Sequence, residues 1–243
     1  MTSNPMTQSN IYENIAIDSE PMTVSGAVNK TILLLLVTFA VGVFTWTQAF
    51  SGYMDKVVML MWGGIIAGLI LAIIMRFKPQ NAKILSIGYA VCEGLAIGGL
   101  SAMYEMQLHG IVANAALITF LTLLVMLILY KTGIIKATET FKRVIFTATA
   151  SIMVFYLVSI VISFFNPNFI SIWNTGLLGI GLSLVFCAVA ALNFILDFDF
   201  IEQGAQKMVP KYFEWFGAFS LLVTIVWLYL ELLRLLAQLS KNR

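Results

Sequence analysis

Long apolar runs separated by short polar segments fill most of this chain. Seven of the runs are about 20 residues long, the length that an α-helix needs to cross a bilayer, and they cover residues 31–50, 57–75, 84–104, 111–130, 144–165, 175–197 and 212–237. Lipid offers no water to unpaired backbone groups, so each run is predicted to be helical. Because the connections are short, we expect consecutive helices to be antiparallel neighbours. The pattern predicts an all-α, polytopic seven-transmembrane helix bundle over residues 31–243.

The composition agrees with a membrane protein. Of the 243 residues, 60% are hydrophobic and 11% are charged, whereas soluble domains carry about 25% charged residues. The net charge of +2 leaves no large basic patch, and the sequence contains no arginine-rich or zinc-binding motif. We therefore expect the lipid bilayer as a partner and no nucleic acid. Cys92 and Cys187 lie inside apolar runs and are expected to be small packing residues.

The first 30 residues are polar and slightly acidic, with Glu13, Asp18 and Glu20. They show neither the basic n-region nor the cleavage site of a signal peptide, so we expect a disordered tail. This stretch has little apolar surface with which to join a bundle. We therefore expect that removal of residues 1–28 leaves the bundle folded.

The distribution of lysine and arginine predicts the orientation, because cytoplasmic loops carry an excess of both. Ten lie in or beside the tail or the loops that join the second and third, the fourth and fifth, and the sixth and seventh runs: Lys30, Arg76, Lys78, Lys83, Lys131, Lys136, Lys142, Arg143, Lys207 and Lys211. Three lie on the opposite side: Lys56, Lys241 and Arg243. The pattern predicts a multi-pass plasma (inner) membrane protein with a cytoplasmic N-terminus and an outside C-terminus.

Carboxylates at the end of the sixth run are the most informative polar residues. Ionisable residues within a span usually face the bundle interior or a pathway. Asp197 and Asp199 are two residues apart, which on a helix separates them by about 200°. Asn193 shares the face of Asp197, one turn earlier, whereas Asp199 shares its face with Glu202. We therefore expect Asp197 to point inward, and Asp199 and Glu202 to lie at the cytoplasmic mouth.

Other polar residues have both structural and functional interpretations. Glu93 is a mid-span acid that could be simply buried and hydrogen-bonded. Glu231 and Arg234 are spaced to form an i,i+3 ion pair on a stripe that also contains Thr224. Arg76 ends the second run and could be an ordinary snorkelling arginine or a partner of Asp197. The spacings Gly64-x-x-x-Gly68 and Gly94-x-x-x-Gly98 would allow close helix contacts.

Enzyme chemistry finds little support in the sequence. His109 is the single histidine and lies in a predicted outside loop, which removes histidine-based triads and most zinc sites. No glycine-rich phosphate loop follows a strand. We expect neither catalytic activity nor a cofactor.

Several short motifs together resemble a known family. Met75-Arg76 closes the second apolar run, Cys92-Glu-Gly-Leu lies in the third, and Ile195-Leu-Asp-Phe ends the sixth. Leu232-Leu-Arg-Leu-Leu lies near the C-terminus. Their order, with the seven spans, is similar to the transmembrane Bax inhibitor motif family, including its bacterial members. The resemblance covers the chain from about residue 30 onward.

The resemblance implies a central seventh helix and a pH-sensitive calcium leak gated by two facing aspartates. Asp197 looks like the aspartate that closes helix 6, and Arg76 looks like the arginine that binds it when the path is shut. The partner in helix 7 is either Glu231 or Thr224, depending on which motif is matched. With a turn at 204–211, Asp197, Thr224 and Glu231 would lie about 10, 20 and 30 Å from the turn. Glu231 would then reach Asp197 only with a strong helix tilt or a turn nearer residue 214.

These observations leave three functional hypotheses. The first is a calcium or cation leak, with Ca²⁺ near Asp197, because oxygen ligands suit a hard cation. The second is a regulator or substrate of a membrane-bound quality-control protease that engages the tail, a role implied by some bacterial relatives. The third is secondary transport of a small solute, for which the sequence shows neither broken helices nor an inverted repeat.

Overall fold

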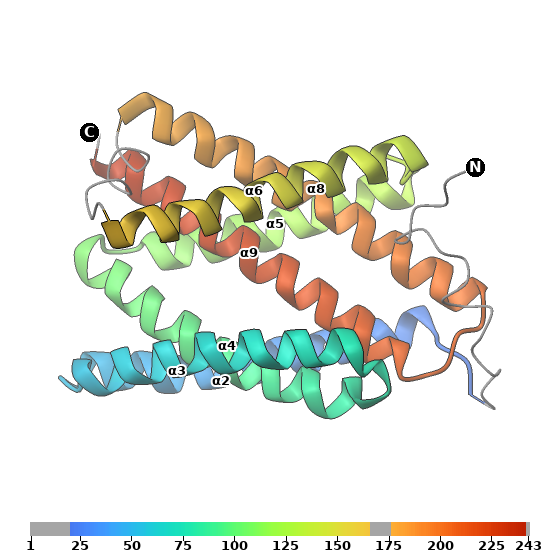
Figure 1. Cartoon of the computed structure of the whole chain (residues 1–243), viewed down its shortest axis with the longest axis horizontal. Helices are drawn as coiled ribbons and strands as arrows, with labels where there is room; N and C mark the ends of the chain where they lie inside the picture. The colour runs from blue at the N-terminus through green and yellow to red at the C-terminus, as the bar shows by residue number, and fades with distance from the viewer. Residues whose placement is uncertain (1–19, 166–175, 242–243) are drawn as a thin grey trace. The chain divides into compact units, whose positions relative to one another are not determined.

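A computed structural model of the chain describes residues 20–165 and 176–241. Within these ranges the chain forms seven long α-helices and one short 3-10 helix, η1 (Figure 1). Their bounds are α2 (Val24–Phe50), α3 (Met54–Phe77), η1 (Pro79–Asn81), α4 (Ala82–Gln107), α5 (Ile111–Lys131), α6 (Glu139–Phe165), α8 (Gly176–Gln206) and α9 (Phe213–Lys241). All seven long helices are long and apolar enough to cross a membrane. The predicted all-α class with seven spans is confirmed.

Two helices extend well beyond their apolar runs. Helix α2 begins at Val24, seven residues before the predicted start, because Thr23 caps it: the Thr23 hydroxyl accepts a 3.0 Å hydrogen bond from the Gly26 N–H. Helix α8 continues past Asp197 to Gln206, and no proline interrupts residues 198–206. The turn between α8 and α9 therefore occupies residues 207–212 rather than 204–211.

Helix α9 is the most buried of the seven spans. In its most apolar 18-residue window 61% of positions are buried, against 11 to 39% in the other spans. The apolar residues that α9 buries include Leu221, Leu222, Ile225 and Val226. This burial agrees with the central C-terminal helix that the family resemblance implies.

The chain divides into two compact units, and helices α4, α8 and α9 each contribute to both. Unit 1 comprises Met1–Gly99 and Asp199–Leu222, and unit 2 comprises Leu100–Phe198 and Val223–Arg243. In unit 1, glycines allow helix backbones to touch. A Cβ atom at Gly64 would lie 2.5 Å from the Cys92 carbonyl oxygen of α4, and one at Gly94 would lie 2.6 Å from the Thr38 carbonyl oxygen of α2.

The segment before α2 is anchored on the α8–α9 turn in unit 1. The Met22 N–H donates to the Val209 carbonyl at 2.8 Å, and the Met22 side chain is buried against Gly204 and Gly217. Glu20 also forms an ion pair with Lys211. The expectation that residues 1–28 do not pack against the bundle is therefore wrong for residues 20–28. We call residues 20–30 the clip segment.

A buried carboxylate completes this attachment. Glu214, in the first turn of α9, is 1% exposed and accepts hydrogen bonds of 2.9 Å from both the N–H and the hydroxyl of Thr23. It also forms an ion pair with Lys30, whose ammonium lies 5.4 Å from the centre of the Trp215 ring. Lys30 is one of the ten basic residues predicted to be cytoplasmic, whereas no sequence pattern singles out Glu214.

Unit 2 has an aromatic and aliphatic core where α6, α8 and α9 meet. Ile152, Phe186 and Val189 are buried together, and Trp227 packs against them. Phe155 and Phe186 form an edge-to-face ring pair with centroids 5.6 Å apart. The core fixes the faces of the three helices that carry the polar residues described below. The predictions for tail residues 1–19, for the start of the sixth span at 175 and for Arg243 lie outside the described residues.

Candidate functional site

Asp197 lies on the buried face of α8. Ala190, Phe194, Asp197 and Ile201 follow one another at helical spacing and are all buried, and Asp197 itself is 7% exposed. A carboxylate on such a face needs polar partners, because burial without them is costly. The polar side chains around Asp197, rather than its position near the end of α8, therefore account for its burial.

Thr224 of α9 is one of these partners. Its hydroxyl donates a 2.6 Å hydrogen bond to Asp197 Oδ2, and Thr224 is 6% exposed. Asp197 lies nine residues from the end of α8 and Thr224 eleven residues from the start of α9. The helical rise places them about 13 and about 16 Å from the turn, nearly level with each other. Glu231 and Thr224 were the two candidates for the partner of Asp197 in the seventh span, which is α9. Thr224 makes the contact.

Asn193, one turn before Asp197, points toward a different neighbour. Its amide donates to the Thr149 hydroxyl of α6 at 2.9 Å and to the Val189 carbonyl of its own helix at 2.8 Å. The side chain thus ties α8 to α6 beside the Asp197 site. The polar stripe on α8 extends one turn deeper than the carboxylate.

Asp199 and Glu202 differ from Asp197 in their surroundings. Asp199 is half-buried and accepts a 2.6 Å hydrogen bond from Gln203 on its own helix. Glu202 is exposed, and the Gln206 amide donates to it at 3.4 Å. The buried carboxylate of the three is Asp197, in line with the opposite faces that the sequence predicts.

Glu231 belongs to a second polar cluster in unit 2, two turns farther along α9 than Thr224. One oxygen accepts hydrogen bonds from the Tyr156 hydroxyl and, at 3.2 Å, from the Trp227 ring N–H. The other lies 2.8 Å from Arg234 Nη2, in a geometry that makes an ion pair without a hydrogen bond. The i,i+3 ion pair between Glu231 and Arg234 that the sequence predicts is present. Glu231 is therefore engaged in this second cluster.

Arg234 connects the three helices of this second cluster. Its guanidinium donates to the Tyr156 hydroxyl of α6 at 2.6 Å and to the Ser183 hydroxyl of α8 at 3.3 Å. Ser183 in turn donates to Gln238 at 3.0 Å, and the guanidinium lies 5.3 Å from the centre of the Phe186 ring. Tyr156, Ser183 and Gln238 were not predicted as site residues, because their only sequence signal is that they are polar residues within apolar runs.

The two remaining predicted residues lie in unit 1. Glu93 is half-buried in α4, with Tyr89 one turn earlier as its hydrogen-bonding neighbour. Arg76 is exposed in the last turn of α3. The pairing of Arg76 with Asp197, which belongs to unit 2, stays a prediction.

The Asp197 site presents oxygen atoms from two helices, the Asp197 carboxylate of α8 and the Thr224 hydroxyl of α9. A carboxylate and a hydroxyl are ligands that a hard cation accepts, although Ca²⁺ takes six to eight such ligands in a resident site. Across residues 20–165 and 176–241, no group of three or more His, Cys, Asp or Glu residues could hold a metal ion.

Comparison with known proteins identifies the family. The family described as Bax inhibitor 1 like matches residues 3–241 of the chain. No curated relative and no solved structure matches it. Because the match covers nearly the whole sequence, including all seven spans, the chain belongs to the Bax inhibitor 1 like family of membrane proteins.

Proposed function

We propose that the protein is a pH-sensitive cation leak channel, favouring calcium, in which Asp197 forms the gate. The observation that carries this proposal is a carboxylate that is 7% exposed within an apolar span and hydrogen-bonded across to Thr224 of α9. A carboxylate in this position costs free energy, and such residues in spans commonly mark ion pathways or proton relays. Its charge changes on protonation, which supplies the pH response.

Arg76 acts in this proposal as the latch that holds ionised Asp197 in the shut state. An arginine can form two parallel hydrogen bonds to one carboxylate, so the pair is strong while the carboxylate is charged. Protonation of Asp197 removes that attraction. Flux should therefore increase on mild acidification, and Arg76→Ala should increase flux at neutral pH while it retains part of the pH response.

We place the N-terminus in the cytoplasm and the C-terminus outside, in the plasma (inner) membrane. Seven crossings put the two ends on opposite sides, and ten basic residues lie on the N-terminal side against three on the other. This orientation puts the α8–α9 turn, and with it the Asp197 end of α8, toward the cytoplasm.

Calcium entry into sealed vesicles tests the proposal. Full-length protein is reconstituted into vesicles that contain a calcium-sensitive dye, and entry is recorded at several pH values for wild type, Asp197→Asn and Asp199→Asn. We expect Asp197→Asn to lose most of the pH response, whereas Asp199→Asn, a matched change two residues away, should resemble wild type. A wild-type pH response in Asp197→Asn, or its loss in Asp199→Asn alone, would refute the proposed gate.

A second function is regulation of, or degradation by, a membrane-bound quality-control protease. It is supported by the polar, slightly acidic N-terminal segment, which is of the kind that a protease can grasp. Removal of residues 1–19 separates the two functions. It should abolish engagement by the protease and leave calcium entry unchanged, because the clip segment and all seven spans remain.

A further inference from the structure

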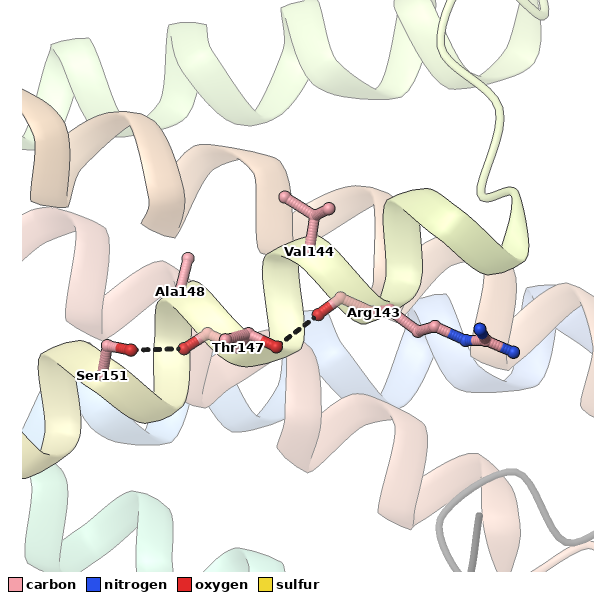
Figure 2. Close-up of a pocket in the computed structure, with 5 residues that line it drawn as sticks. All are labelled: Arg143, Val144, Thr147, Ala148 and Ser151. Atoms are coloured by element: carbon pink, nitrogen blue, oxygen red, sulfur yellow. Dashed lines mark hydrogen bonds between the residues drawn. The ribbon is translucent and has the colours of Figure 1, made fainter. Parts of the chain in front are cut away.

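A shallow, open groove runs along one face of α6 in unit 2. It has a volume of about 430 Å³ and is lined by Arg143, Val144, Thr147, Ala148 and Ser151 (Figure 2). From Arg143 to Ser151 the helix advances about 12 Å. This is close to the depth of one leaflet, since the whole hydrocarbon core is about 30 Å thick.

The hydroxyl groups in the groove are already used by the helix itself. Thr147 donates to the Arg143 carbonyl at 2.8 Å, and Ser151 donates to the Thr147 carbonyl at 2.8 Å (Figure 2). Their hydrogens are therefore not offered to a ligand, and Val144 and Ala148 add apolar surface between them. A polar solute would gain little here, whereas an acyl chain would keep its contacts with hydrocarbon.

The end of the groove carries a cation. Arg143 is exposed, and Figure 2 shows its side chain extending along the helix away from Thr147 and Ser151. Among the described residues, no hydrogen bond or ion pair involves its guanidinium. The nearest acid on the same helix, Glu139, is 3.5 Å from Lys142. An unpaired guanidinium has the geometry to bind a phosphate with two parallel hydrogen bonds.

We propose that this groove binds one anionic phospholipid. The phosphate lies on Arg143, and an acyl chain follows α6 past Val144 and Ala148 to Ser151. The charge selects the lipid, because an arginine or lysine at a membrane surface attracts anionic headgroups. The groove orients the bound lipid, because an acyl chain attached to that headgroup has to run along α6 into the leaflet. This binding site is independent of the Asp197 gate.

Native mass spectrometry of the detergent-solubilised full chain tests the proposal. The protein is mixed with equal amounts of phosphatidylglycerol and phosphatidylcholine with identical acyl chains, and the ratio of the two bound lipids is measured. Wild type should retain phosphatidylglycerol preferentially. Arg143→Gln should reduce that preference about fivefold, the factor that one basic residue contributes to headgroup attraction.

Lys136→Gln is the matched control. Lys136 lies in the loop before α6, is exposed, and has its side chain over Gly133 rather than in the groove. It should retain most of the preference although it loses the same charge. Equal losses in Arg143→Gln and Lys136→Gln would show a general surface attraction and overturn the site.

Two further measurements address the groove itself. Ser151→Phe fills the groove from an exposed position and should reduce retention of the lipid while Arg143 remains. Inorganic phosphate in excess should not displace the lipid, because the acyl chain contributes to binding. Displacement by phosphate would indicate a simple anion site, and unchanged retention in Ser151→Phe would place the lipid elsewhere; either result overturns the proposal.

Discussion

Thr224 donates a 2.6 Å hydrogen bond to Asp197, from α9 to α8, across 27 residues of sequence. The transmembrane Bax inhibitor motif family, as the resemblance implies, has two facing aspartates at such a place. In this chain the α9 side chain that donates to Asp197 is a neutral hydroxyl.

Thr224→Asp should create a carboxylate pair with Asp197 and change the pH response. Two carboxylates at hydrogen-bonding distance do not both ionise readily, so one retains a proton to higher pH. The pH at which calcium entry increases should therefore move upward. The measurement is calcium entry into vesicles over a pH series, with Thr224→Asn as a neutral control of similar size. Coincident pH profiles for the two variants would contradict this account.

The predicted depths of Asp197 and Thr224 depended on where the α8–α9 turn was placed. With the turn at 204–211 and a rise of 1.5 Å per residue, the two residues were predicted to differ in depth by about 10 Å. The observed turn at 207–212 follows from the continuation of α8 to Gln206 and brings the two residues nearly level. Hydropathy alone could not locate this end, because the last nine residues of α8, 198–206, include polar residues and lie outside the apolar run.

Lys30 and Glu214 form a buried pair whose disruption should be costly. The Glu214 side chain is 2% exposed and that of Lys30 18%. Removal of one partner of a buried pair costs about 3–5 kcal/mol, because the other charge stays buried without compensation. Lys30→Met should therefore lower the thermal unfolding midpoint strongly. Glu214→Gln in the same chain should recover part of the loss, since the amide oxygen still accepts from Thr23.

The double-mutant cycle of Lys30→Met and Glu214→Gln measures this coupling directly. Additive effects of the two substitutions would show that the charges do not interact. The pair could not be anticipated from the sequence, because its members are separated by 184 residues. Lys30 precedes the first apolar run, and Glu214 reads as an ordinary acid in the first turn of a helix.

Truncation of the N-terminus should have two distinct outcomes. Removal of residues 1–19 should leave the unfolding midpoint unchanged, because that stretch has the low apolar content of a segment that does not join a core. Removal of residues 1–28 should lower the midpoint, since it deletes the Thr23 cap and the buried Met22. An N-cap alone contributes about 1 kcal/mol. Equal midpoints for the two truncations would show that the clip segment contributes nothing.

The Glu20–Lys211 ion pair should add a small pH-dependent stabilisation. The Lys211 ammonium, through a hydrogen bond and its charge, lowers the pKa of Glu20 below 4.5, and Glu20 raises the pKa of Lys211 above 10.5. The contribution of Glu20 is present above 4.5 and lost as the pH falls through its lowered pKa. That of Lys211 is present below 10.5 and lost as the pH rises through its raised pKa.

Glu20→Gln checks this dependence. The difference in unfolding midpoint between wild type and variant should be constant from about pH 5 to about pH 10 and vanish in acid. It should be small at any pH, because both side chains are exposed, and it should disappear at about 1 M salt, where charges are screened over about 3 Å. A difference that persists in high salt would assign the effect to packing rather than charge.

Gly64 and Gly63 should respond differently to the same substitution. The sequence motif Gly64-x-x-x-Gly68 predicted a close helix approach, and the structure assigns the closeness to Gly64: a Cβ there would lie 2.5 Å from the Cys92 carbonyl, whereas one at Gly68 makes an ordinary contact of 3.5 Å. At Gly63 nothing lies within 4 Å. Overpacking costs about 1–3 kcal/mol, while alanine is favoured over glycine in a helix by about 1 kcal/mol. Gly64→Ala should therefore lower the unfolding midpoint, and Gly63→Ala should leave it unchanged or raise it. If both substitutions had the same effect, helix propensity rather than backbone contact would govern this face of α3.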